Sequence, residues 1–338
     1  MASGVREIGR GDAPAAERFR GEIVEPCRPV VLRGLAADWP AVAAGRRSPA
    51  TFAGYLARFA TDTPVEAFFG APEIAGKYYY GARPDGFNFE RRRMRFTEAL
   101  AMLQASRVAD GASAYVGSVP TELCLPGFAV ENTTAQLGQA VEPRIWLGTA
   151  SNVSCHYDTL DNLAVVAAGA RRFTLYAPEL IGSLYVGPID NTMAGQPVSL
   201  AASAGPAGQG DFPLFEQVRD QAQVVELEPG DALYLPKLWW HQVEATAPFN
   251  ALVNYWWDAS SQGPDAPYAS LLLAMIAIGE RPPAERAAWK AFFDHYAFRT
   301  AGHPLAHLPE EKHGLLGPLK GGNYGRIRAR VMQMLRGG

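Results

Sequence analysis

Short apolar runs separated by turn residues dominate the middle of the chain. Between residues 114 and 260 they read AYVGSVP, PRIWLGTA, LAVVAAG, RRFTLYAP, QVVELEPGDALYLP, HQVEAT and NALVNYWW. Runs of this length, bounded by Gly, Pro or Asp, predict β-strands. Many such strands without intervening helical patterns predict an antiparallel sandwich or barrel. We therefore expect a β core over residues 114–260.

Helical patterns flank this core on both sides. Within residues 1–113, SPATFAGYLARFA and RFTEALAMLQASR have apolar residues at helical spacing, and RPVVLRG indicates a short buried strand. We expect these elements to pack on the core. Residues 261–338 contain three amphipathic segments, PYASLLLAMIAIG, PAERAAWKAFFDHYAF and YGRIRARVMQMLRGG, whose apolar faces need either the core or a second copy of the chain. The predicted fold class is mainly β with flanking helices.

Two further segments are expected at the surface. AGQPVSLAASAGPAGQGDFP, residues 194–213, is rich in Gly, Ala and Pro and indicates a long surface insertion. ERRRMRF, residues 90–96, is the one dense basic run, and we interpret it as the solvated face of a helix, with a substrate or RNA contact as the alternative.

Composition narrows the class of protein. The chain has 338 residues, of which 48% are hydrophobic and 19% charged, so a sizeable core can be buried. A net charge of −3 gives no electrostatic footprint for DNA. Three widely spaced cysteines argue against a disulfide framework or a zinc knuckle. The N-terminus has no apolar signal core, and the longest apolar run is shorter than a bilayer span, so we expect a cytoplasmic protein.

Candidate chemistry lies in SNVSCHYDTLDN, residues 151–162. On a strand, residues two apart point to the same side, so His156 and Asp158 would share one space. Two histidines and one carboxylate form the ligand set typical of non-haem Fe(II) oxygenases. Of the five other histidines, only His241, in YLPKLWWHQVEA, lies within the β region. These residues indicate either a metal site or a core histidine beside a hydrated turn.

Three segments together resemble a known family. HYDTLDNLAVVAAGARRFTLYAPE, ELEPGDALYLPKLWWHQVEA and NALVNYWW, in this order, resemble the JmjC or cupin-8 family of 2-oxoglutarate-dependent oxygenases. Within this family they are similar to the branch that contains the hypoxia-factor asparaginyl hydroxylase and the tRNA wybutosine hydroxylase. RPVVLRGLAADWPA also resembles the entry segment of that branch. The resemblance implies a double-stranded β-helix (jelly-roll) with an H-x-D…H triad at His156, Asp158 and His241. It also implies Fe(II), 2-oxoglutarate as cosubstrate, and hydroxylation of a C–H bond.

The resemblance also implies a cation for the far carboxylate of 2-oxoglutarate. Related hydroxylases place a lysine at the position that is Arg171 here, after Gly169. Arginine can grip a carboxylate through two hydrogen bonds. Arg172 is the adjacent alternative, because strand alternation lets only one of the two point inward. In the other interpretation, both arginines lie at the solvated end of a hairpin.

Other polar residues match family positions near the cosubstrate. Asn162 and Asn254 are amides in otherwise apolar strands, and either a cosubstrate or internal capping would satisfy them. Ser154 lies two residues before His156, where a hydroxyl could reach the cosubstrate. One tyrosine is expected to help, with Tyr115 and Tyr78 to Tyr80 as candidates. Five tryptophans are expected mostly in the core, with one or two at the entrance: Trp146, Trp239, Trp240, Trp256 and Trp257.

Rival interpretations remain open at this point. A metal-binding cupin that acts as a sensor or scaffold without 2-oxoglutarate turnover is one, since Arg171 replaces the usual lysine. A cupin enzyme with another metal and no 2-oxoglutarate is another, although the G-x-H-x-H pattern is absent. The expected substrate is a protein side chain, a small molecule or a modified nucleoside, with RNA disfavoured by the net charge. Related hydroxylases pair through helices after the β core, which implies a homodimer.

Overall fold

The computed structural model describes residues 4–81, 86–104, 111–137, 141–190, 192, 195–203, 212–261 and 263–337. The chain divides into two compact units, Met1–Ala259 and Ser260–Gly338. Each unit is described by itself below.

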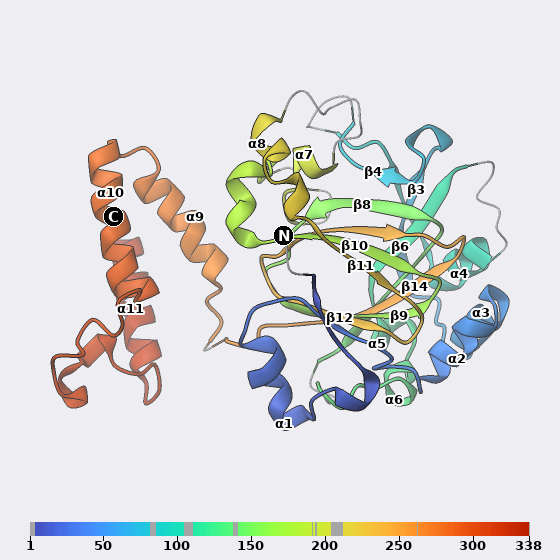
Figure 1. The fold of residues 1–338 in the computed structure, drawn as a ribbon, viewed down its shortest axis with the longest axis horizontal. Helices are drawn as coiled ribbons and strands as arrows, with labels where there is room; N and C mark the ends of the chain where they lie inside the picture. Colours follow the sequence, from blue (N-terminus) through green and yellow to red (C-terminus); the bar gives the residue numbers. More distant parts are fainter. Residues whose placement is uncertain are drawn as a thin grey trace. The chain divides into compact units, whose positions relative to one another are not determined.

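Two β-sheets form the first unit (Figure 1). Over the described residues, the larger sheet has nine strands in the order β1 (Arg6–Ile8), β2 (Val30–Leu32), β12 (Ala232–Leu235), β9 (Asp161–Ala168), β14 (Asn250–Trp257), β7 (Pro143–Gly148), β6 (Ser113–Pro120), β3 (Pro64–Gly70) and β5 (Glu90–Arg95). The smaller has five in the order β11 (Gln223–Leu227), β10 (Arg171–Tyr176), β13 (Trp240–Ala245), β8 (Ser151–His156) and β4 (Lys77–Tyr78). Most pairs are antiparallel; β1 with β2 and β4 with β8 are parallel.

Strand β9 shows why the central apolar run has no polar alternation. All eight of its residues are buried. Leu163, Val165 and Ala167 belong to the core on one side of the larger sheet, whereas Ala164 and Val166 belong to the core between the two sheets. From Leu163 to Ala168 the strand is apolar at every position, because each of its faces borders a core; the polar Asp161 and Asn162 stand at its start. The predicted β core with flanking helices is therefore confirmed.

Helices and short helical turns cover the first unit's outer core. Their bounds are α1 (Ala16–Phe19), α2 (Pro40–Arg47), α3 (Pro49–Ala57), α4 (Phe96–Gln104), α5 (Thr121–Cys124), α6 (Phe128–Glu131), α7 (Leu200–Ser203) and α8 (Pro213–Glu216), with 3-10 or π turns at Arg10–Asp12, Arg20–Val24, Pro72–Ile74, Pro178–Ser183 and Arg219–Gln221. The predicted Ser-Pro start of α3 is present, since the Ser48 side chain accepts a hydrogen bond from the Thr51 amide. Part of the helix predicted from Arg95 lies outside the described residues.

The basic run ERRRMRF was expected on a helix, and this expectation is wrong. Its first six residues form β5, an exposed strand at the edge of the larger sheet. Its register with β3 runs from Pro64 opposite Arg95 to Phe69 opposite Glu90. Helical and strand conformations both solvate arginine, so the pairing with β3, a long-range contact, decides the conformation. Charged residues on an edge strand also disfavour association with other chains.

The second unit is helical. Its elements are α9 (Pro267–Ile278), α10 (Pro283–Phe293) and α11 (Asn323–Arg336), with short π or 3-10 turns at Asp294–Phe298, Glu310–Lys312 and Gly314–Leu316. No residue of α9 or α10 is buried, although α9 is mostly apolar. Among the described residues of the chain, no helix is long and apolar enough to cross a bilayer.

The turn from β9 to β10 depends on Gly169. Its φ of +73° lies in the left-handed region, and a Cβ there would overlap Asn250 Oδ1 and Phe249 O. We expect Gly169→Ala to lower the free energy of unfolding by roughly 2–5 kcal/mol, from backbone strain and overpacking. Gly54→Ala, in α3 with open space around it, is the control and should raise it by about 0.5–1 kcal/mol. Denaturant titration measures both, and an unchanged midpoint for Gly169→Ala would contradict this account.

Candidate metal centre

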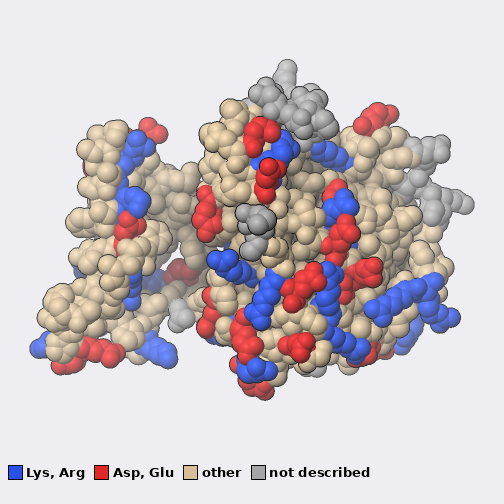
Figure 2. Space-filling model, in the orientation of Figure 1, with Lys and Arg blue, Asp and Glu red and all other residues tan. Residues whose placement is uncertain are grey.

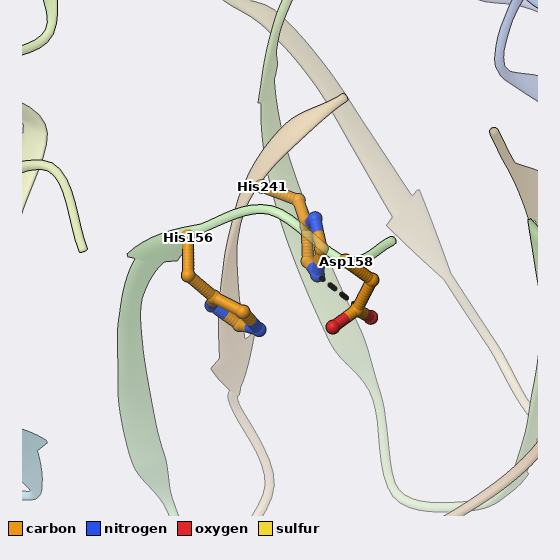
Figure 3. Close-up of side chains that lie close together, drawn as sticks. All are labelled: His156, Asp158 and His241. Atoms are coloured by element: carbon orange, nitrogen blue, oxygen red, sulfur yellow. Dashed lines mark ion pairs between the residues drawn. The ribbon is translucent and has the colours of Figure 1, made fainter. Parts of the chain in front are cut away.

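The register between β8 and β13 brings two histidines together. It places His156 directly opposite His241, and the centroids of the two imidazole rings lie 4.3 Å apart. Asp158 lies two residues beyond the end of β8 and turns its carboxylate toward the same point (Figure 3). The three side chains therefore converge as expected, although Asp158 is placed by the turn after the strand and not by strand alternation.

The three side chains form a compact ligand set. One ligand atom from each lies within 4.8 Å of the other two. The distance from His241 Nε2 to Asp158 Oδ2 is 3.8 Å, and this oxygen is buried without a hydrogen-bond partner. A buried, unpaired carboxylate oxygen is costly unless a cation or donor is bound to it. Two imidazole nitrogens and a carboxylate oxygen around one point fit a divalent metal such as Fe(II).

Backbone carbonyls orient both imidazoles. His156 Nδ1 lies 2.8 Å from Ser154 O, and His241 Nδ1 lies 2.9 Å from Trp239 O. A hydrogen bond from Nδ1–H to a carbonyl leaves Nε2 as the free ligand atom. Burial, followed by the neighbouring His156, lowers the pKa of His241 to about 4. His241 is therefore neutral near pH 7, and the neutral imidazole is the form that binds a metal. A neutral His241 also provides no positive charge for the nearby Asp158 oxygen.

The ligand set faces a cavity of about 220 Å³ between the two sheets. Strands of both sheets and the segment before α7 contribute to its wall. Its lining residues include Tyr115, Ser118, Trp146, Ser154, Asn162, Arg171, Phe173, Gln196, Val198, Asn254 and Trp256 besides the three ligands.

Arg171 begins β10 and points into this cavity. It is 8% exposed, its Nε has no hydrogen-bond partner, and no described carboxylate forms an ion pair with it. Burial lowers its pKa to about 10, so it stays charged near pH 7. The neighbouring Arg172 points outward and pairs with Glu226 at 2.7 Å. A buried guanidinium without a protein anion is suited to bind an anionic ligand.

The structure places the other expected polar residues in different surroundings. Asn162 lines the cavity and its Oδ1 has no partner, whereas Asn254 Oδ1 accepts a hydrogen bond from Trp146 Nε1 at 2.9 Å. Ser154 also lines the cavity, but its hydroxyl donates to the Tyr78 carbonyl. Among the described lining residues Tyr115 is the one tyrosine. Asn162 and Tyr115 are therefore better placed for a ligand than Ser154.

The segment expected as a surface insertion contributes to the cavity, so that expectation is wrong for its described part. Val198 is 2% exposed and pairs with His156 in an isolated β-bridge, and Gln196 lines the cavity. Residues 204–211 lie outside the described residues. The short apolar stretch PVSL was the sequence feature that could have indicated a buried segment, because a solvated loop does not need apolar residues. Trp146 and Trp256 also line the cavity, as the expectation of one or two entrance tryptophans allowed.

Comparisons with known proteins agree with this architecture. The sequence profile of the cupin-like domain family matches residues 15–263. Jumonji C domain-containing protein 5 of Drosophila melanogaster is 26% identical over 265 residues, which cover 75% of this chain and 60% of that protein. Lysine-specific demethylase 8 of Xenopus tropicalis is 24% identical over 260 residues, covering 72% of this chain and 51% of that protein.

A more local similarity extends to other proteins. HSPB1-associated protein 1 of Homo sapiens is 29% identical over 120 residues, covering 34% of this chain and 23% of that protein. The chain thus spans about half of the length of the relatives that it matches most extensively. These relatives do not test the asparaginyl and wybutosine hydroxylase branch, which stays an expectation.

Proposed function

The chain belongs to the cupin-like domain family, and from this premise we propose that it is an Fe(II)- and 2-oxoglutarate-dependent oxygenase. One observation carries the proposal. A single cavity holds a two-histidine, one-carboxylate ligand set and a buried arginine without a protein anion. The first feature suits Fe(II) with open coordination positions, and the second suits a dicarboxylate cosubstrate.

The proposed function assigns a role to the metal ligands and to several of the polar residues that line the cavity. His156, Asp158 and His241 hold Fe(II), and the carbonyls of Ser154 and Trp239 keep the two Nε2 atoms turned toward it. Bound Fe(II) and 2-oxoglutarate supply oxidative decarboxylation coupled to hydroxylation of a C–H bond.

Other lining residues bind the cosubstrate. Arg171 binds the far carboxylate, and Tyr115 and Asn162 supply further polar contacts. Asn254 orients Trp146, and the Ser154 hydroxyl stays bound to the backbone. The apolar wall limits the access of water to the reacting atoms.

Charge in the cavity bears on the substrate class. Among the described lining residues, Asp158 is the one carboxylate, and in this proposal it is a metal ligand. A cationic side chain such as lysine would enter without a free counter-charge, which is costly in a buried site. This favours an uncharged or anionic substrate group, on a protein or small molecule. Figure 2 shows acidic and basic side chains interspersed on the visible face of the first unit, with no continuous basic field for RNA.

A second proposal concerns assembly. We propose that a second copy of the chain covers the helices of the C-terminal unit. The exposed apolar residues of α9 and α10 are Leu271, Leu272, Leu273, Met275, Ile276, Trp289 and Phe292. Figure 2 shows much of this unit without charged side chains. Exposed apolar surface of this density is typical of protein interfaces.

The function is tested by succinate formation from 2-oxoglutarate with Fe(II) and ascorbate, without added substrate. We expect slow uncoupled turnover in the natural protein and none above the iron-free background in His156→Ala or Asp158→Ala, because each removes a metal ligand. His307→Ala, which changes an exposed histidine of the C-terminal unit, is the control and should keep full turnover. Full turnover in His156→Ala would exclude the ligand set. Binding of both Fe(II) and 2-oxoglutarate without turnover would favour the metal-binding scaffold.

Arg171 and Arg172 should differ in cosubstrate binding. We expect Arg171→Ala to weaken 2-oxoglutarate binding by about 2–3 kcal/mol, since it removes a buried charge-assisted contact. Arg172→Ala should leave it essentially unchanged, because Arg172 lies outside the cavity wall and pairs with Glu226 at the surface. Calorimetric titration in the presence of a redox-inactive divalent metal measures both constants. The reverse order would mean that the inward-facing residue of β10 has been misassigned.

Ile276 tests the proposed assembly. It is 82% exposed on α9, and Ile276→Glu would place a charge in the proposed interface. We expect the natural chain to sediment as a dimer and this variant as a monomer. Val130→Glu, equally exposed at 74% on α6 of the first unit, should stay dimeric. A natural chain that is monomeric across a wide concentration range in sedimentation experiments would refute the dimer.

A further inference from the structure

A buried carboxylate follows the metal ligand Asp158 closely in the sequence. Asp161 begins β9, three residues after Asp158, and is 1% exposed. Its Oδ1 accepts a hydrogen bond from the Tyr234 hydroxyl at 2.9 Å, and its Oδ2 accepts one from the Ala259 amide at 3.2 Å. The ammonium of Lys237 lies 3.3 Å from the same Oδ2. Among the residues that the structure describes, Lys237 is the one cation within ion-pair distance of this carboxylate.

Lys237 belongs to the turn that leads into the other metal-ligand strand. It lies between β12 and β13, four residues before His241, and its ammonium also donates to Asp258 Oδ1 at 2.6 Å. The next residue, Leu238, has a φ of +68°, which a leucine adopts only when its surroundings hold it there. The Leu238 amide donates to the carbonyl of Asp158 at 2.8 Å.

Besides the pairing of Leu235 with Asn162 and the Tyr234–Asp161 hydrogen bond, two further contacts join the segments that lead to Asp158 and His241. One is the backbone hydrogen bond from Leu238 to Asp158, and the other is the side-chain ion pair from Lys237 to Asp161. Both connect the turn that carries Asp158 to the turn that precedes His241. The two ligands, Asp158 and His241, are distant in the sequence. The backbone hydrogen bond between their segments is made by Leu238, whose φ is strained, so the ion pair provides a second connection.

We propose that Lys237 and Asp161 are positioning residues, whose ion pair sets the separation of the Asp158 carboxylate and the His241 imidazole for metal binding. The inference rests on the metal site of the proposed function. The proposed role differs from general stabilisation, because the ion pair connects the segment after Asp158 to the segment before His241. Neither residue lines the cavity, so neither contacts a bound cosubstrate directly. Residues that hydrogen-bond metal ligands directly affect metal affinity by about 10–100-fold, and we expect an effect toward the lower end of this range from an ion pair that acts through the backbone.

The opposite end of β12 offers a matched control. Arg33 pairs with Asp231 at 2.7 Å, and Asp231 also accepts hydrogen bonds from the Gly34 and Glu228 amides. Among the described residues, Asp231 and Asp161 each have one cation within ion-pair distance; the Asp231 side chain is 14% exposed and that of Asp161 1%. Asp231 precedes β12 and Lys237 follows it, so the control pair does not join the ligand segments.

The experiment measures Fe(II) affinity of the metal-free full chain under anaerobic conditions, by competition with a chelator. Asp161→Asn combined with Lys237→Met removes the ion pair without leaving a buried charge. Asp231→Asn combined with Arg33→Met is the control. Thermal unfolding of the metal-free proteins reports any loss of stability separately. The visible spectrum of bound Co(II) reports ligand geometry at saturating metal.

We expect the first double variant to bind Fe(II) at least about tenfold more weakly and to change the Co(II) spectrum. The control should keep both properties of the natural protein. Lys237→Arg, which keeps the cation, should retain near-natural affinity. Lys237→Gln, which keeps a hydrogen bond but no charge, should weaken it, and this test stands even if the double variant does not fold.

Natural affinity in Lys237→Gln and in the first double variant would overturn the inference, as would equal weakening in both double variants. A natural protein that binds no Fe(II) would instead refute the proposed function, and the inference with it.

Discussion

The antiparallel register of β8 and β13 is the constraint on which the site depends. It sets His156 opposite His241, and a slip of one residue would turn one imidazole to the other face of the sheet. Apolar packing between the two sheets holds the register, through residues such as Phe173 and Leu175 of the neighbouring β10. Ligand geometry is thus a consequence of core packing, and the two carbonyl contacts to Nδ1 complete it.

Charged groups with buried atoms fall into two sets, those that protein groups compensate and those with an atom that has no partner. Asp161 is fully compensated by protein groups, with Lys237, a tyrosine hydroxyl and a backbone amide around it. Asp158 and Arg171 have atoms without a hydrogen-bond partner among the described residues, and both face the cavity. Because an uncompensated buried charge is costly, such groups are retained where a ligand completes them. In the proposed function, Asp158 binds the metal cation and Arg171 binds the anionic cosubstrate, in one cavity.

Two expectations failed for the same physical reason. The arginine run of β5 and the described part of the Gly- and Ala-rich insertion each have a local composition compatible with several conformations. Pairing with β3 makes the first a strand, and the bridge between Val198 and His156 draws the second into the site. Neither partner is close in the sequence, so a local pattern such as PVSL could indicate burial but not the strand with which the segment pairs.

By itself, the sequence determined the β core, the flanking helices and the three candidate ligands. Apolar runs, turn residues and the H-x-D spacing are short-range properties that the local chain carries. Tertiary structure alone decided that Arg171 faces the cavity while Arg172 pairs with Glu226, and that Tyr115 lines it in preference to Tyr78. These outcomes depend on register and on contacts between distant strands, because the direction of each side chain follows from the pairing of its strand.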